Sequence, residues 1–218
     1  MTDLPSLLFL LAGLSLIPIL VVSCTSFLKI AIVLLIVRSA MGVQQVPPNI
    51  ALYSIALVAT IFVMAPVLQP IGTWMNAADF PNQLHSSSGG LSRLVEQVSG
   101  PLRDFMIKHT RPALQEMLHE AAIKLWPPEM HLQITKTHWL LVVPSFVLSE
   151  LQSAFEIGFL IYLPFVAIDL LISNVLLALG MQMVSPMVIT TPLKLLLFIT
   201  INGWANLLNK LLLSYQEF

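Results

Sequence analysis

The chain has 218 residues, of which 57% are hydrophobic and only 10% are charged, and its mean hydropathy is +0.87. Soluble domains carry about 25% charged residues, so this low charge content excludes a freely soluble monomer. The high apolar content excludes an intrinsically disordered chain. The formal net charge of −1 gives no basic field for nucleic acid. A single cysteine, Cys24, excludes an intramolecular disulfide and a cysteine-based zinc site. Two classes of protein remain: a helical membrane protein, and a subunit that is buried by its partners.

The positions of the charges divide the chain into three blocks. Of the 21 charged residues, 12 lie within positions 73–136. We therefore predict an all-α protein with an N-terminal hydrophobic helical hairpin over 1–72 and a polar, mostly helical, extracytoplasmic insert over 73–137. Hydrophobic helices with a Met-rich loop follow over 138–218.

The first block contains two segments, 4–23 and 50–71, that each supply the roughly 20 apolar residues a membrane span needs. Between them, Gly42 is expected to end a helix, and Pro47 and Pro48 to prevent its continuation. The amides of Gln44 and Gln45 can hydrogen-bond exposed backbone groups at this junction.

The insert shows apolar residues at three- and four-residue steps over 91–106 and 114–125, which is the helical period. Gly100-Pro101 and Pro112 are expected to divide it into short helices.

The second hydrophobic block begins with an apolar stretch over 138–179. As one helix this stretch would be roughly 63 Å long, too long for one crossing, so a kink or break is expected at Gly158 or Pro164. A last helix is expected from Thr191-Pro192 to about Leu213. The intervening Gly180–Met187 is predicted to be a loop, either a functional one or ordinary packing, since methionine is flexible and fits varied shapes.

Few residues point to catalysis or metal binding. The five histidines, four of them in the insert, show neither HExxH nor i, i+4 spacing, so we expect no metal site. No phosphate loop or nucleophile motif is present, and we predict neither an enzyme nor a cofactor. The histidines are His85, His109, His119, His131 and His138.

Six charged residues lie within or beside apolar segments, where an unpaired charge is costly. We expect them to pair with one another or with neighbouring subunits. The alternative is a proton-coupled transporter that uses Glu150, Glu156 or Asp169, although no internal repeat of the transporter kind is evident. The six are Lys29, Arg38, Glu150, Glu156, Asp169 and Lys194.

Several motifs together resemble the FliP/YscR/SpaP (SctR) family, the core membrane proteins of the type III secretion export apparatus. They are Thr25–Lys29, Arg38–Asn49, Pro144–Glu150, Phe155–Asp169, and Met181–Lys194 with Gly203-Trp204 beyond. The non-basic N-terminus, expected to be retained, is more similar to injectisome members than to flagellar ones.

The resemblance implies a non-enzymatic, pore-forming subunit of an export gate that conducts unfolded proteins across the bacterial inner membrane. Its implied partners are further copies in a pentameric set, two smaller membrane subunits, the larger export-gate subunit, the exported proteins and membrane lipid. Family helices form hairpins raised toward the periplasm, which would turn the six charges into candidates for pairs between subunits.

The family also carries a methionine gasket in the loop that matches Met181–Met183. Relatives have three consecutive methionines, whereas this chain has Gln182 in the middle. The resemblance therefore implies sealing by Met181 and Met183, with Met187 next. Gln182 then either faces away from the channel or makes the seal looser and more polar.

Overall fold

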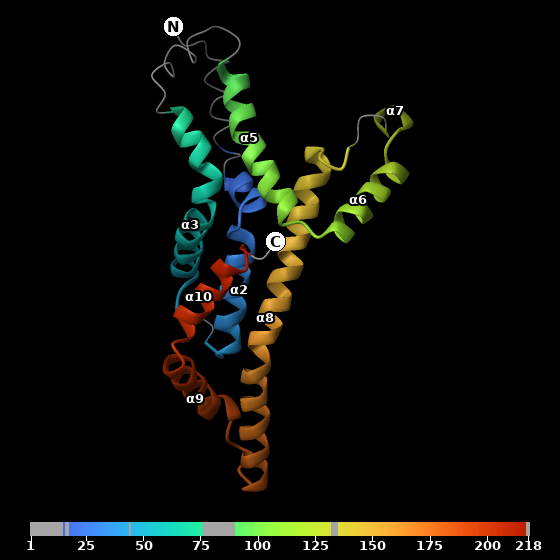
Figure 1. Ribbon diagram of the computed structural model, residues 1–218. Helices are drawn as coiled ribbons and strands as arrows, with labels where there is room; N and C mark the ends of the chain where they lie inside the picture. The colour runs from blue at the N-terminus through green and yellow to red at the C-terminus, as the bar shows by residue number, and fades with distance from the viewer. Residues whose placement is uncertain (1–14, 16–17, 44, 76–89, 132–134, 217–218) are drawn as a thin grey trace. The chain divides into compact units, whose positions relative to one another are not determined.

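The computed structural model describes residues 15, 18–43, 45–75, 90–131 and 135–216, and every regular element in these ranges is a helix. The predicted all-α class is confirmed. The helices are α2 (Phe27–Ala40), α3 (Asn49–Met75), α5 (Gly90–Lys108), α6 (Pro112–Leu125), α7 (Pro128–His131), α8 (Trp139–Ala178), α9 (Pro186–Thr200) and α10 (Gly203–Leu213), preceded by a short helix over Pro18–Cys24 (Figure 1).

The chain forms two compact units. One combines Met1–Leu28 with Phe62–Glu150, and the other combines Lys29–Ile61 with Leu151–Phe218. The insert helices α5, α6 and α7 thus share a unit with the first part of α8, whereas α9 and α10 share a unit with most of α2.

Two described helices are long and apolar enough to cross a membrane, α3 over Asn49–Pro70 and α8 over its full length. Two further pairs meet the same criterion only together: Pro18–Cys24 with α2, and α9 with α10. The helix predicted over 50–71 is confirmed. Most of the segment predicted over 4–23 lies outside the described residues.

The helix α8 runs for 40 residues without the break expected at Gly158 or Pro164. Gly158 instead permits close packing against α2. A β-carbon added there would lie 2.5 Å from Cδ1 of Ile36 and 3.1 Å from its Cγ2. The glycine therefore serves helix–helix contact rather than a break in the helix.

The last helix begins earlier than predicted and divides into two. Ser185 precedes α9 and Pro186 occupies its first turn, so the helix begins here, and Pro192, expected in the first turn, lies inside the helix. Asn202 then adopts left-handed backbone angles (φ 51°, ψ 44°), and α10 leaves at 63° to α9. The prediction of one helix from Thr191-Pro192 to Leu213 is therefore wrong.

In the insert, α5 continues through Gly100-Pro101, so the expected division at that dipeptide is also wrong. The division before Pro112 is confirmed, because α5 ends at Lys108 and α6 begins at Pro112. The hydroxyl of Ser149 on α8 fixes this corner. It donates to the carbonyl of His109 and accepts the backbone N–H of Arg111, both at 3.1 Å.

Apolar contacts complete the attachment of the insert to α8. The Phe105 ring lies edge-on to Phe146 with centroids 5.8 Å apart. On α6, Ala122 is buried together with Leu141 of α8, and Leu118 packs against them. The insert is thus packed on the start of α8.

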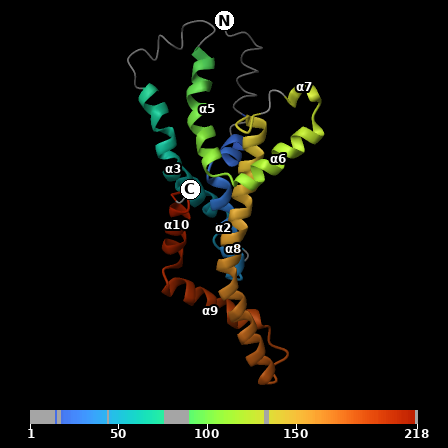
Figure 2. The same cartoon turned by 45° about the vertical axis from the view of Figure 1, so that its right-hand side comes forward.

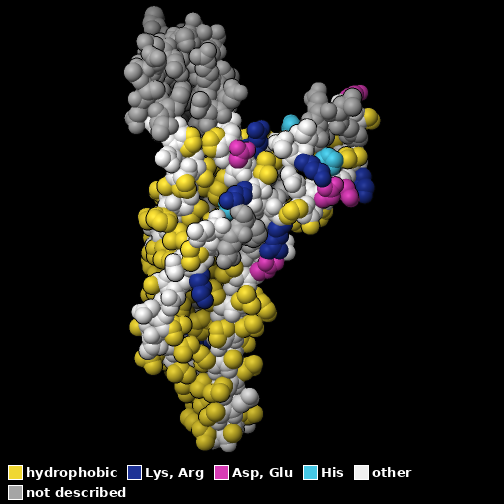
Figure 3. Space-filling model, in the orientation of Figure 1, with side chains coloured by type: hydrophobic (Ala, Val, Ile, Leu, Met, Phe, Trp, Pro, Cys, Tyr) yellow, Lys and Arg dark blue, Asp and Glu magenta, His cyan; other side chains and the backbone are white. Residues whose placement is uncertain are grey.

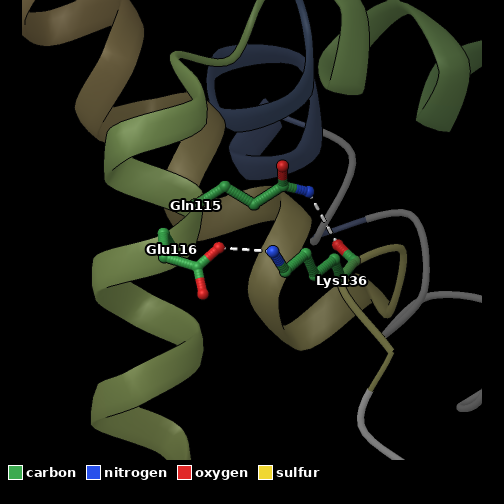
Figure 4. A network of polar contacts seen from close by, with 3 residues as sticks. All are labelled: Gln115, Glu116 and Lys136. Atoms are coloured by element: carbon green, nitrogen blue, oxygen red, sulfur yellow. Dashed lines mark hydrogen bonds and ion pairs between the residues drawn. The ribbon is translucent and has the colours of Figure 1, made fainter.

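A polar network joins α6 to the turn before α8 (Figure 4). The Lys136 ammonium forms an ion pair with Glu116, and the Gln115 amide donates to the Lys136 carbonyl at 2.8 Å. Both charged side chains are exposed. The hydrogen bond from Lys136 and its positive charge lower the pKa of Glu116 below its usual value.

The helix α2 forms the core of the second unit. Its side chains are buried on most of its circumference, including Ile30, Val33, Leu34 and Val37. Apolar burial on every side of a helix is typical of a central element rather than of a surface helix.

The Glu116–Lys136 pair predicts a pH dependence of the α6 attachment. Because the folded pKa of Glu116 is lowered, its contribution is complete above the ordinary glutamate pKa of about 4.3 and is lost as the pH falls through the folded value. Lys136→Gln should raise the Glu116 pKa toward its ordinary value in a carboxyl NMR titration, whereas Glu120→Gln on the same helix should leave it unchanged. An ordinary Glu116 pKa in the parent chain would contradict this assignment.

Candidate functional site

The loop between α8 and α9 presents the methionines singled out from the sequence, and lies at the end of α8 (Figure 1, Figure 2). Gly180 ends α8 in the left-handed region (φ 71°). The Met181 N–H donates to the Leu176 carbonyl at 2.9 Å, and the Gly180 N–H donates to that of Leu177 at 3.0 Å. This pair of bonds is the Schellman pattern of a helix end. Of the loop predicted over Gly180–Met187, residues 180–185 are confirmed, whereas Pro186 and Met187 belong to α9.

The methionines of this loop are turned to the outside. Met183 is 100% exposed, Met181 43% and Met187 49%. Gln182 is also exposed, and Met187 lies in the first turn of α9 rather than in the loop itself. A fully exposed methionine at the tip of a turn offers an adaptable apolar contact to another molecule.

Lys194 of α9 holds three elements of the second unit together. Its ammonium contacts the Asp169 carboxylate of α8 at 2.5 Å and donates to the Ala40 carbonyl at 3.2 Å. Lys194 is only 4% exposed, whereas the Asp169 side chain is 43% exposed. A cation at the carbonyl end of α2 also complements the helix dipole. The structure thus pairs two of the six predicted charges within one chain.

A second contact between α2 and α9 lies beside the first. Gly42 ends α2 with φ 76°, as predicted, and its N–H donates to the Ser39 carbonyl at 3.0 Å. A β-carbon at this position would lie 3.0 Å from Thr191 Oγ1 and 3.7 Å from Met187 Cε. The end of α2 therefore lies directly against the first turns of α9, next to the methionine loop.

Arg38 closes the turn between α2 and α3. Its Nη1 donates to the Pro47 carbonyl at 3.2 Å and to Asn49 Oδ1 at 2.5 Å. Pro48 supplies the carbonyl that accepts the Ala51 and Leu52 amides of α3, so a proline expected only to prevent the first helix from continuing also begins the next one. Gln45 is exposed, and Gln44 lies outside the described residues.

The other three charges lie in different settings. The Lys29 ammonium is buried 3.6 Å above the centre of the Tyr215 ring, a cation–π contact. Glu150 is 1% exposed. Glu156 is exposed and accepts a hydrogen bond from the Gln152 amide at 3.1 Å. Pairing between subunits stays a prediction for all six.

Within the described residues, no group of three or more histidine, cysteine, aspartate or glutamate side chains could hold a metal ion. His109 is buried and packs on the Phe105 ring with centroids 4.6 Å apart, which is a structural role. His85 lies outside the described residues.

Several contributors were missed from the sequence. Tyr215 carries no local pattern that distinguishes it from a surface residue, and Ser149 lies in the Pro144–Glu150 motif without a contact having been predicted for it. Thr191 was expected only to begin the last helix, although its side chain lies against Gly42 inside the unit. Only the glycine, whose left-handed role was expected, pointed to this contact.

Comparison with known proteins identifies the family. The FliP family model matches residues 10–211. Harpin secretion protein HrcR of Erwinia amylovora is 55% identical over 205 residues, which cover 94% of this chain and 93% of the relative. Yop proteins translocation protein R of Yersinia pestis is 40% identical over 211 residues (96% and 95%), and virulence protein YscR of Salmonella typhimurium is 42% identical over 210 residues (96% and 94%).

The chain belongs to the FliP family. Its relatives identify it with the SctR proteins of type III secretion injectisomes, which confirms the resemblance seen in the motifs. The match spans both hydrophobic blocks and the insert. In this FliP-family chain, the turn closed by Arg38 and the methionine loop thus belong to one unit that is tied together by Lys194.

The Gly42–Thr191 contact predicts unequal costs for two glycine substitutions. Gly42→Ala should cost about 1–2 kcal/mol of unfolding free energy for its left-handed backbone, and more because the added methyl group meets Thr191. Gly180→Ala carries the same backbone cost and meets no other atom within 4 Å. Denaturation of both variants in detergent measures the difference.

Thr191→Ala provides the check on this contact, because it removes the hydroxyl that the methyl group would meet. Combined with Gly42→Ala, it should bring the total loss below the sum of the two single losses. Equal losses for the two glycine variants, or strict additivity of the pair, would show that Gly42 serves only the backbone.

Proposed function

We propose that this chain is a pore-forming core subunit of the type III secretion export gate, which conducts unfolded proteins across the bacterial inner membrane. Its methionine loop seals the channel when no substrate is inside. Family membership supports a role in the secretion apparatus. Relatives named for the secretion of harpins and the translocation of Yop proteins support a polypeptide cargo.

The observation that carries the sealing role is the complete exposure of Met183 at the tip of a loop whose base is fixed. An exposed apolar tip is unfavourable in water unless another surface covers it. Equivalent tips from several copies can cover one another around an axis, and their unbranched chains can part for an incoming polypeptide. Gln182 adds one polar group to such a ring.

The surface of the chain supports assembly with other subunits. Only 11% of the most apolar 18-residue stretch of α8 is buried within the chain. In the equivalent stretch of α3 the buried share is 28%. Figure 3 shows hydrophobic side chains over the lower part of α8 and over α9, while charged side chains gather over α6. Exposed patches of this extent mark protein or membrane contacts.

The proposed neighbours are further copies of this chain in a pentameric set, two smaller membrane subunits and the larger export-gate subunit. The complex would lie at the base of the secretion apparatus, raised toward the periplasm. In that setting the chain works by lining and closing a channel, not by catalysis, and it needs no cofactor.

The sealing role predicts an ion leak when the methionines are shortened. Met181→Ala with Met183→Ala should raise the conductance of the assembled gate, because two flexible side chains per copy no longer fill the channel axis. Membrane potential or small-molecule entry in expressing cells measures the leak. Met117→Ala is the matched control, since Met117 is a half-exposed methionine of α6 and does not belong to the loop.

Wild-type permeability in the double variant, with assembly intact, would contradict the sealing role. Solute transport by a monomeric chain that is lost with Glu150→Gln, Glu156→Gln or Asp169→Asn would instead support the proton-coupled transporter.

A further inference from the structure

The second unit contains a cavity of about 520 Å³ between α8 and the bend that joins α9 to α10. Its size lies within the range of roughly 300–1,000 Å³ that small-molecule sites occupy. Ile157 and Ile161 of α8 line one side, and Leu197 of α9 and Leu207 of α10 line the others. The proposed channel function leaves this cavity unassigned.

The bend that forms the cavity is built by specific residues. Asn202 adopts the left-handed conformation that ends α9. The Phe198 ring occupies the space that a β-carbon on the buried Gly203 would need. The same ring packs against Trp204 at 5.2 Å and Phe165 at 6.3 Å between centroids. This aromatic cluster fixes the angle of α10, so the cavity is a feature of the fold.

The wall of the cavity is apolar except for one row on α10. Asn206, Lys210 and Ser214 are four residues apart, so they lie on one helix face. Two of these side chains already form hydrogen bonds within the chain. The Asn206 amide donates to the Ile201 carbonyl at 2.6 Å, and the Ser214 hydroxyl donates to the Leu211 carbonyl at 2.7 Å. Lys210 is exposed, and none of the described carboxylates forms an ion pair with it.

An occupant of this cavity must therefore be apolar along its body and anionic at one end. A single hydrocarbon chain is narrow and flexible, so it can follow the apolar wall.

We propose that the cavity holds one acyl chain of an anionic membrane phospholipid, whose phosphate contacts the Lys210 ammonium. The apolar wall binds the chain, and Lys210 selects for a negatively charged headgroup. The site lies on an apolar helix pair that together meets the length and composition of a membrane span, so bilayer lipid is the available source.

Fluorescence quenching of Trp204 tests the proposal, since this ring packs on Phe198 of the cavity wall. The full chain, with Trp74, Trp126 and Trp139 replaced by phenylalanine, is placed in phosphatidylcholine nanodiscs. Brominated phosphatidylglycerol or brominated phosphatidylcholine is added at equal mole fractions. We expect phosphatidylglycerol to quench at an about five-fold lower fraction, the preference one lysine contributes near a membrane surface.

Two variants and one control separate the parts of the site. Lys210→Gln should remove the preference for phosphatidylglycerol while leaving quenching by phosphatidylcholine. Ile161→Phe should reduce quenching by both lipids, because the larger ring fills part of the cavity. Lys124→Gln, at an exposed lysine on α6 outside the cavity, should change neither. Lys210 is exposed, so Lys210→Gln leaves the fold intact and still tests the lipid preference if Ile161→Phe disturbs folding.

Equal quenching by the two lipids in the parent chain would overturn the proposal, as would a preference that survives Lys210→Gln. The same measurement on the purified assembled complex supplies a further outcome. Protection of Trp204 from both lipids there would show that a neighbouring subunit occupies the cavity, and would also overturn the proposal.

Discussion

The chain cannot cover its own apolar surface, and this constraint underlies the rest of its structure. The helix α8 has 40 residues and few neighbours within the chain, so most of its apolar window stays exposed. Burial of such a surface is the main driving force of association. Contacts with other molecules must therefore cover these helices, and the proposed neighbours are further copies, other subunits and lipid. Membership of a family of secretion-apparatus proteins is consistent with this requirement.

Within the second unit, a few polar contacts keep the uncovered helices in register. Lys194 joins α9 to α8 through Asp169 and to α2 through the Ala40 carbonyl. Arg38 closes the turn that follows α2. The Lys194 ammonium is buried, whereas the Asp169 carboxylate is 43% exposed; such a pair adds little stability but can fix the register of the helices. The methionine loop begins eleven residues after Asp169 and ends nine residues before Lys194, and the hydrogen bonds of Gly180 and Met181 fix its base while its tip stays exposed.

The all-α class, a loop that starts at Gly180 and the helix end at Gly42 could be predicted from composition and from glycine and proline positions, although the loop ends at Ser185 and not at Met187. Helix continuity did not. Gly158 and Gly100-Pro101 were expected to interrupt helices, yet Gly158 serves packing on Ile36, and α5 passes through its proline. Local propensity is weak against tertiary contacts. The Lys194–Asp169 pair and the Lys29–Tyr215 contact join residues far apart in the sequence, so no local pattern could show them.

The central claim, that other subunits cover α8, is tested most directly by photocrosslinking in the assembled apparatus. A benzoylphenylalanine at Phe159, which is 62% exposed in the apolar part of α8, would be irradiated in cells with and without the other apparatus subunits. Burial by neighbours predicts protein crosslinks, to a second copy or another export subunit, that disappear when those subunits are absent. Crosslinks to lipid alone in the complete apparatus would contradict the account.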